Sequence, residues 1–218
     1  MAAALPDLAD IREAHARIRP FVHWTPAVTS HTLDRLAGRE LVFKCENLQH
    51  VGAFKYRGAT NAVQMLDDET AARGVATHSS GNHAQALALA ARARSIPAYV
   101  VMPRTAPAVK REAVAGYGAT IIPCEPTLQA REEALAEVVA DTGAHFVHPY
   151  DDPRVIAGQG TAVLELLEDA GPLDAVITPV GGGGLLSGTA IAVHGRAPTC
   201  RVYAAEPAGA DDAARSLH

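Results

Sequence analysis

Short apolar runs alternate with alanine-rich stretches along the chain, and this alternation limits the fold more than any other feature. The apolar runs are typical of strands at residues 41–46, 74–78, 98–102, 119–123, 145–148, 174–180 and 200–206. The stretches between them predict helices at 55–66, 81–94, 107–116, 127–141, 158–169 and 184–195. Apolar runs of this kind suit strands that are covered on both faces. We therefore expect an α/β fold in which mainly parallel sheets lie between helical layers.

Turn and capping residues suggest where elements and domains end. Asp152 followed by Pro153 is typical of a helix start, and Gly38 and Gly143 are typical of helix stops. Turn residues also cluster near 73–74 and 150–153. We predict two three-layer αβα domains, a large one formed by residues 1–73 and 152–218 and a small one formed by residues 74–151.

Composition and charge exclude several classes of partner. The chain has 218 residues, of which 48% are hydrophobic, so it can bury a sizeable core. Its formal net charge of −5 gives no electrostatic reason to expect nucleic acid or an anionic membrane as a partner. The long uncharged run 175–193 contains Pro179 and consecutive glycines, which favours a strand, a loop and a helix over a membrane span.

The cysteines and the N-terminal residues indicate the cellular compartment of the protein. Cys45, Cys124 and Cys200 are far apart and have neither metal-site spacing nor a disulfide framework. The first residues lack the basic and long apolar regions of a signal peptide and instead predict an amphipathic helix. We therefore expect a reducing, cytoplasmic compartment.

Four consecutive glycines lie in the stretch PVGGGGLLSG (179–188), between a predicted strand and a predicted helix. Without side chains the backbone can approach an anion closely, and the start of the helix adds further N–H donors. A phosphate is the ligand that this arrangement favours. The alternative is that the glycines form only a flexible turn. The stretch does not match the G-x-x-x-x-G-K-[ST] pattern of a nucleotide phosphate loop.

A second polar turn lies in the stretch THSSGNHAQA (77–86), again between a strand and a helix. Its free N–H groups could hold a carboxylate, with the Ser80 hydroxyl and the Asn82 amide beside it. Ordinary N-capping explains the same residues equally well.

Lys55 stands among apolar and small residues in GAFKYRGA (52–59), where a helix is predicted to begin. It is either a surface lysine or a covalent anchor for a carbonyl cofactor. A phosphorylated carbonyl cofactor needs a lysine for a Schiff base, a glycine loop for its phosphate and a further cradle for the substrate carboxylate. Pyridoxal phosphate meets all three requirements.

With these motifs in order, the chain resembles the serine racemase and threonine dehydratase family of pyridoxal-phosphate enzymes, known as fold type II. The resemblance is carried by GAFKYRGA, SSGNHAQ (79–85), VIAGQGT (155–161) and GGGGLLSG (181–188), and it extends over nearly the whole chain. Serine is common in the family where this chain has Ala53. Cysteine synthases share the fold, but their threonine-rich substrate loop differs from SSGNHAQ.

The resemblance implies a role for each matching residue. Lys55 would form the Schiff base, and Ser80 would lie on the opposite face of the cofactor. The other cofactor-binding residues would be Phe54, Asn82, Gly181, Gly182, Gly183, Gly184 and Leu185. The substrate carboxylate would be held by Ser79, Asn82 and His83, with Ser80 beside them.

Two further matches concern a cation and the far end of the substrate. Glu206, Ala210 and Asp212 match a divalent-cation site of the family, and oxygen ligands of this kind suit magnesium or calcium. A helix cap is the alternative. Arg131 matches an arginine that reaches toward the distal end of the substrate and could favour a second carboxylate, as in 3-hydroxyaspartate. A surface arginine is the alternative.

The resemblance implies an ammonia-lyase that converts L-threonine, L-serine or 3-hydroxyaspartate to a 2-oxo acid and ammonia, with serine racemisation as a second outcome. Its partners would be a small amino-acid substrate and a second copy of the chain in a homodimer. Family members continue beyond the cation site, so we expect the C-terminal part of the large domain to be absent here. The alternative function is that of an inactive pyridoxal-phosphate-binding fragment with a regulatory or associating role.

Overall fold

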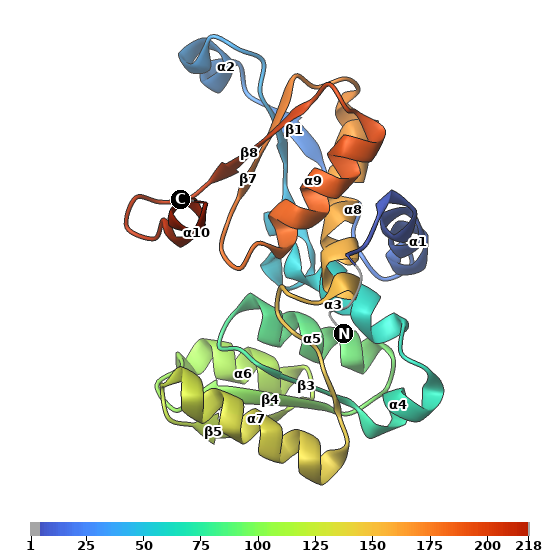
Figure 1. Cartoon of the computed structure of the whole chain (residues 1–218), viewed down its shortest axis with the longest axis vertical. Coiled ribbons are helices and arrows are strands. Elements are labelled where there is room, and N and C mark those ends of the chain that lie inside the picture. The colour runs from blue at the N-terminus through green and yellow to red at the C-terminus, as the bar shows by residue number, and fades with distance from the viewer. Residues whose placement is uncertain (1–4, 218) are drawn as a thin grey trace.

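The structure, a computed structural model, describes residues 5–217 (Figure 1). Its strands are β1 (Ala27–Thr29), β2 (Val42–Lys44), β3 (Val75–His78), β4 (Ala98–Pro103), β5 (Thr120–Cys124), β6 (His145–Phe146), β7 (Ala175–Pro179) and β8 (Arg201–Ala205). Its α-helices are α1 (Leu8–Ile18), α2 (His31–Ala37), α3 (Lys55–Gln64), α4 (Asp68–Arg73), α5 (Asn82–Ala93), α6 (Ala108–Gly116), α7 (Leu128–Thr142), α8 (Pro153–Ala170), α9 (Gly184–Arg196) and α10 (Asp212–Ser216). Two short 3-10 turns, η1 (Glu46–Leu48) and η2 (His50–Gly52), precede α3.

A parallel sheet of four strands, in the order β5-β4-β3-β6, forms the lower part of Figure 1. Side chains alternate across β4, so Val100 and Met102 pack with α5 and α6 on one face, while Val101 packs with α7 on the other. This sheet is therefore buried on both sides, which explains why its strands are continuous apolar runs.

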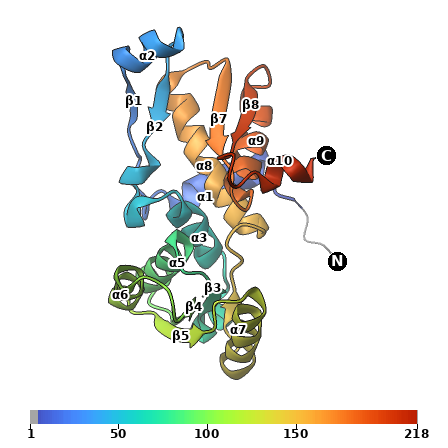
Figure 2. The same ribbon diagram turned by 90° about the vertical axis from the view of Figure 1, so that its left-hand side faces the viewer.

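The remaining elements gather around α8, which contacts α1, α3 and α9 (Figure 2). Their strands form two separate pairs, β1 with β2 antiparallel and β7 with β8 parallel. The core here joins Ile11 of α1, Val163 and Leu166 of α8, Val176 of β7 and Val193 of α9. The long helix α8 therefore lies at the centre of this group, in contact with α1, α3 and α9.

Glycines allow α3, α8 and α9 to pack closely. A Cβ on Gly158 of α8 would lie 2.6 Å from the Cα of Gly58 on α3, and a Cβ on Gly160 would lie 2.8 Å from the carbonyl oxygen of Gly188 on α9. Real Cβ atoms do not approach other atoms this closely, so larger residues would push the helices apart. The two glycines of VIAGQGT therefore serve helix packing.

A buried ion cluster holds α3 against α8. Arg57 of α3 is fully buried and donates to both carboxylate oxygens of Glu46 and of Glu165, over distances of 2.7 to 2.8 Å. Lys44 of β2 lies 2.9 Å from Glu165. Burial alone would raise the pKa of Glu165, but hydrogen bonding with His15 and Arg57 and the positive charge of Arg57 lower it to about 2. The cluster therefore fixes the helix that begins with Lys55.

The expected α/β architecture with a mostly parallel sheet is confirmed, and several details differ. The helix predicted at 158–169 begins at Pro153, because the Asp152 carboxylate caps it by accepting the N–H of Arg154. Gly38 and Gly143 end α2 and α7 with positive φ angles of 64° and 70°, as glycine stops do. The elements β1, α4 and α10 were not predicted, and only the end of α2, at Gly38, was predicted, because each of these elements is short and has little apolar periodicity.

No helix within residues 5–217 is both long and apolar enough to cross a membrane. Cys45, Cys124 and Cys200 are all free thiols. The predicted domain boundaries remain predictions.

Candidate active site

Lys55 is the first residue of α3, and its side chain is half-buried. Its Nζ atom donates a hydrogen bond of 2.7 Å to the carbonyl oxygen of Pro149 and lies 5.4 Å from the centroid of the Phe54 ring. Burial lowers the pKa of Lys55 to about 8, because a charged amine loses hydration there. The surface-lysine alternative does not fit this environment.

The backbone just before Lys55 takes up an uncommon conformation. Val51 and Gly52 have φ angles of 57° and 68°, both in the left-handed region. A β-branched residue such as Val51 rarely adopts this conformation without support from its surroundings. Val51 packs against the core cluster that includes Tyr56, which holds the turn in place.

The serine loop, residues 79–81, connects β3 to α5. Ser79 and Ser80 are half-buried, and Asn82 is exposed at the first position of α5. The Ser79 hydroxyl accepts the N–H of Gly81 at 3.3 Å. Because α5 starts here, the N–H groups of its first turn have no carbonyl partner within the helix and can bind an anion.

His83 of α5 is buried and neutral. Its Nε2 lies 3.3 Å from the carbonyl oxygen of Val147, so this nitrogen carries the proton. Burial, together with the charge of Lys55, lowers the pKa of His83 to about 3. Within residues 5–217 its other ring nitrogen has no hydrogen-bond partner. His83 can therefore hold a carboxylate through its main-chain N–H but not through a charged ring.

The glycine loop, residues 181–184, connects β7 to α9. Gly183 is the N-cap of α9 and has a φ of 86°, which requires glycine. The first main-chain bond of the helix runs from the Ser187 N–H to the Gly183 oxygen, which leaves the N–H groups of Gly184 and Leu185 without a helical partner. A Cβ on Gly181 or Gly183 would meet no atom within 4 Å, so there is open space beside this loop.

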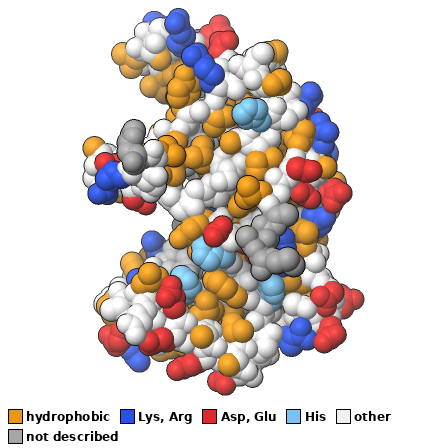
Figure 3. Space-filling model, in the orientation of Figure 1, with side chains coloured by type: hydrophobic (Ala, Val, Ile, Leu, Met, Phe, Trp, Pro, Cys, Tyr) orange, Lys and Arg blue, Asp and Glu red, His pale blue; other side chains and the backbone are white. Residues whose placement is uncertain are grey.

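A segment that sequence reasoning missed brings these parts together. Residues 147–152, which we call the crossover segment, run from β6 to α8. Val147 contacts His83, Pro149 contacts Lys55, and Tyr150 packs on Gly182 and Gly184. Only the cluster of turn residues near 150–153 marked this segment in the sequence. Figure 3 shows the molecular surface hollowed on its left side between the four-stranded sheet with its helices and the elements around α8, with histidine side chains on the surface next to the hollow.

Arg131 lies in α7, near the carboxyl end of the four-stranded sheet. Its charge helps to lower the pKa of His78, the last residue of β3, after the larger effects of burial and of His148. Its Nε is buried and finds no hydrogen-bond partner within residues 5–217. An unpaired buried donor of this kind is available to an anionic group.

The residues predicted as cation ligands lie apart from Lys55, after β8. Both carboxylate oxygens of Glu206 accept main-chain N–H groups of α10, from Ala213 at 3.1 Å and Ala214 at 2.9 Å. Asp212 is in the first turn of that helix. Across residues 5–217 no three His, Cys, Asp or Glu side chains gather in a way that could hold a metal. In this conformation Glu206 serves as a helix cap.

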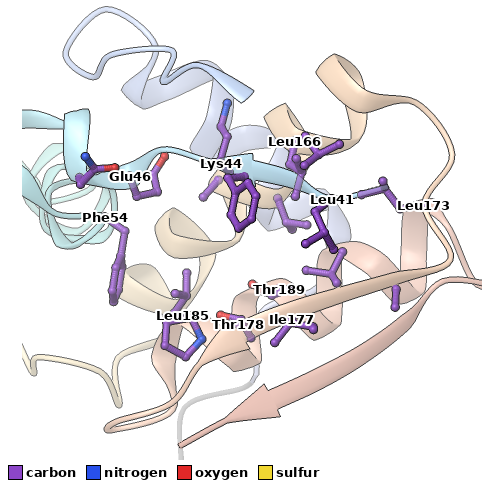
Figure 4. A pocket seen from close by; sticks show the side chains of 18 of the residues that line it. Leu41, Lys44, Glu46, Phe54, Leu166, Leu173, Ile177, Thr178, Leu185 and Thr189 are labelled. Atoms are coloured by element: carbon purple, nitrogen blue, oxygen red, sulfur yellow. The ribbon is translucent and has the colours of Figure 1, made fainter. Parts of the chain in front are cut away.

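An open apolar cavity of about 460 Å³ separates β2 from β7. Figure 4 shows Leu41 and Lys44 on one side and Ile177 and Thr178 on the other, with Phe54 and Leu173 toward opposite ends of the view. Leu185, which follows the glycine loop, also lines it. The cavity therefore extends from the candidate cofactor site along the edges of both strand pairs.

The residues present fit pyridoxal phosphate. Lys55 offers an amine with a lowered pKa, which makes the neutral, nucleophilic form accessible near neutral pH. The glycine loop offers open space, and the N–H groups of Gly184 and Leu185, which have no partner within α9, can donate to a phosphate. The start of α5 offers a further set of N–H groups for a carboxylate.

Comparison with known proteins identifies the family. The family model described as pyridoxal-phosphate dependent enzyme matches residues 18–218. The β-hydroxyaspartate dehydratase of Paracoccus denitrificans is 58% identical over 98% of this chain and 68% of its own length. The serine racemase of Dictyostelium discoideum superposes with a TM-score of 0.96 at 54% identity, over 98% of this chain and 70% of that structure.

A threonine deaminase from T.th. superposes with a TM-score of 0.91 at 46% identity, over 97% of this chain and 68% of that structure. The chain thus spans about two thirds of the length of these relatives. The matched region contains Lys55, the serine loop and the glycine loop. This chain therefore belongs to the family of pyridoxal-phosphate dependent enzymes.

Proposed function

We propose that the protein is a pyridoxal-phosphate dependent ammonia-lyase for β-hydroxy amino acids, with serine racemisation as a second outcome. The observation that carries this proposal is the half-buried amine of Lys55, which the crossover segment holds near the start of α5 and the glycine loop. The names of the relatives, which include a β-hydroxyaspartate dehydratase and a serine racemase, point to the same substrates.

Each side chain then has a defined task. Pyridoxal phosphate supplies a carbonyl for Schiff-base chemistry and a ring that takes up electrons from the substrate Cα. Lys55 would hold it through Nζ and would serve as the base for the substrate Cα proton. The N–H groups at the start of α5 hold the substrate carboxylate, and the Ser80 hydroxyl exchanges a proton on the other side. The phosphate would be held by Gly181, Gly182, Gly183, Gly184 and Leu185, and the cofactor ring would lie against Phe54 and Asn82.

The direct test is a product assay. The purified chain with pyridoxal phosphate should release ammonia and a 2-oxo acid from L-serine, L-threonine or L-threo-3-hydroxyaspartate, and chiral analysis of the remaining serine reports racemisation. Lys55→Ala should abolish both reactions, whereas Ser80→Ala should reduce racemisation more than elimination. A visible absorption band that does not respond to any of these amino acids would contradict the proposed activity of this chain.

Arg131 defines the preferred substrate within this proposal. Its buried Nε, which has no hydrogen-bond partner within residues 5–217, and its charge near His78 suit the second carboxylate of a 3-hydroxyaspartate. Arg131→Gln should lower kcat/KM for 3-hydroxyaspartate by roughly tenfold to a hundredfold, the effect of one lost charge-assisted hydrogen bond. The same change should affect L-serine little, and Arg92→Gln, on the distant end of α5, is the matched control. Equal losses for both substrates would contradict this role.

The open cavity favours a second candidate function. Apolar side chains such as Ile177, which is 70% exposed, line a cavity between two strand edges, and such surfaces favour association. The chain would then act as a cofactor-binding fragment that associates with another chain. Light scattering distinguishes the two, since a monomer that turns over substrate contradicts the associating role.

The homodimer, the cytoplasmic compartment and the divalent cation remain predictions. For the cation, magnesium or calcium would have to displace the N–H bonds that Glu206 makes to α10. Adding either ion should raise the melting temperature of the wild-type chain and not that of Glu206→Gln. Equal shifts in both proteins would show that the ion acts elsewhere.

A further inference from the structure

Tyr150 lies directly on the glycine loop. A Cβ built on Gly182 would overlap atoms of the Tyr150 ring, and a Cβ on Gly184 would fall 2.9 Å from the Tyr150 carbonyl oxygen. Real Cβ atoms do not approach other atoms this closely, so neither position can carry a side chain while Tyr150 stays in place. Two of the four consecutive glycines are thus required by a neighbouring residue of the chain itself.

The other two glycines of the loop behave differently. A Cβ on Gly181 would meet nothing within 4 Å, and Gly181 does not have a positive φ. Gly183 also has open space, but its φ of 86° excludes most other residues. Gly181 is therefore a matched control for Gly182, since both are exposed and they are neighbours in the loop.

The turn that carries Tyr150 is well fixed. The Nδ1 atom of His148 accepts the N–H of Asp151 at 2.8 Å, and the His148 and Tyr150 rings meet edge to face with centroids 4.6 Å apart. The preceding carbonyl, that of Pro149, accepts the hydrogen bond from Lys55. One short turn therefore contacts both the cofactor lysine and the glycine loop.

We propose that Tyr150 is a positioning residue that sets the conformation of the glycine loop, and that its ring, rather than the cofactor phosphate, requires glycine at position 182. The part of this proposal that concerns cofactor binding rests on the proposed function. The ring backs the loop at Gly182 and its main chain meets Gly184, where the unpaired N–H groups of α9 begin. Tyr150 thereby keeps these donors directed at one place, which lowers the cost of binding a phosphate.

The first test is a double-mutant cycle in urea unfolding, without cofactor. Gly182→Ala should lower the folding equilibrium constant by roughly tenfold, as overpacking does. In the Tyr150→Ala background the same change should alter it by no more than about twofold, the level of an ordinary surface substitution. Gly181→Ala should be tolerated in both backgrounds. Equal effects of Gly182→Ala in the two backgrounds would overturn the proposal.

The second test uses pyridoxal phosphate as the probe, with the dissociation constant and the phosphorus NMR shift of the bound phosphate as readouts. Tyr150→Ala should weaken binding and move the shift, whereas Tyr150→Phe should retain both, because the ring provides the support. Adding Gly182→Ala to Tyr150→Ala should cause no further loss of affinity. If Gly182→Ala weakens binding equally with and without the ring, the phosphate requires the glycine and the proposal is wrong.

The two tests separate this inference from the proposed function. If wild-type protein binds no pyridoxal phosphate, both the proposed function and the positioning role of Tyr150 fail. The unfolding cycle still decides whether the ring is what requires glycine at position 182. If wild-type protein binds the cofactor and Tyr150→Ala binds it with unchanged affinity and shift, the proposed function stands and the positioning role is overturned.

Discussion

Lys55 and Pro149 are 94 positions apart in the chain, yet the Nζ atom of Lys55 donates a hydrogen bond of 2.7 Å to the Pro149 carbonyl oxygen. This contact joins the first residue of α3 to the crossover segment. The same segment contacts His83 and the glycine loop, so one stretch of chain connects the amine of Lys55 with the start of α5 and with the glycine loop.

The lowered pKa of Lys55 gives a direct prediction about pH. Because burial lowers this pKa from 10.5 to about 8, the fraction of reactive neutral amine should rise with a midpoint near pH 8. Pulsed acetylation across pH 6 to 11, read by mass spectrometry of the peptide that contains Lys55, measures the midpoint. A midpoint near 10.5 would show that the amine is solvated as an ordinary surface lysine.

The same shift has a defined effect on stability. The unfolded chain binds a proton at Lys55 more tightly than the folded chain does, so stability should rise as the pH increases from about 8 to 10.5. Lys55→Met, which removes the titrating amine, should not show this rise. Urea unfolding of both proteins over that pH range provides the comparison.

Covalent attachment of the cofactor can be located directly. The sequence has three lysines, Lys44, Lys55 and Lys110, and Lys44 is engaged with Glu165 and Asp169. Borohydride reduction in the presence of pyridoxal phosphate should therefore add one pyridoxyl group, on Lys55. Peptide mass spectrometry identifies the site, with Lys110 as the internal control. Equal labelling of Lys55 and Lys110 would contradict the assignment of Lys55 as the lysine that binds the cofactor.

The buried ion cluster should contribute strongly to stability. Glu165→Gln removes the buried carboxylate that Arg57 and Lys44 share and leaves only the more exposed Glu46 and Asp169 as their partners, which should cost up to about 3–5 kcal/mol in the free energy of unfolding. The matched control is Glu125→Gln, since Glu125 pairs with Arg104 on the surface, where an ion pair contributes about 0–1 kcal/mol. Denaturant unfolding at neutral pH measures both. Similar losses in the two variants would contradict the assigned role of the cluster.

Acid should remove the stabilisation that the ionised Glu165 carboxylate contributes to the buried ion cluster. The folded pKa of Glu165, about 2, is below its ordinary value of 4.5, so its stabilisation is present above pH 4.5 and is lost as the pH falls toward 2. The wild-type chain should therefore lose more stability than Glu165→Gln between pH 4.5 and 2. Parallel curves for the two proteins would show that this carboxylate does not titrate in the way that its contacts imply.

The glycine contact between α3 and α8 should not tolerate even a methyl group. Gly158→Ala would place its Cβ 2.6 Å from the Gly58 Cα and 2.8 Å from the Arg57 carbonyl oxygen, which should cost about 1–3 kcal/mol. Gly116→Ala, in α6, meets no atom within 4 Å and should be neutral or stabilising by up to about 1 kcal/mol. Thermal unfolding compares the two, and a stable Gly158→Ala protein would show that these helices can separate at little cost.

The fold class and the motifs could be predicted from the amino-acid sequence, because both depend on local patterns. Apolar runs of strand length, the helix stop at Gly143 and the glycines between β7 and α9 all act through their immediate neighbours. The order of the motifs then led to the family. Arg131 and His83 were also named from this resemblance, and their roles remain predictions; the burial of the His83 ring, which lowers its pKa to about 3, is visible only in the structure.

Only the tertiary structure shows how the parts of the site come together and why particular residues, such as Gly182, are required. The contacts of Lys55 with Pro149, of Tyr150 with Gly182, and of Arg57 with Glu165 each join positions that are distant in the chain. No local pattern records such pairs, because they arise when separate helices and loops are packed together. Burial, which lowers the pKa of Lys55, is likewise a property of the packed molecule, since it depends on what surrounds the amine rather than on its neighbours in sequence.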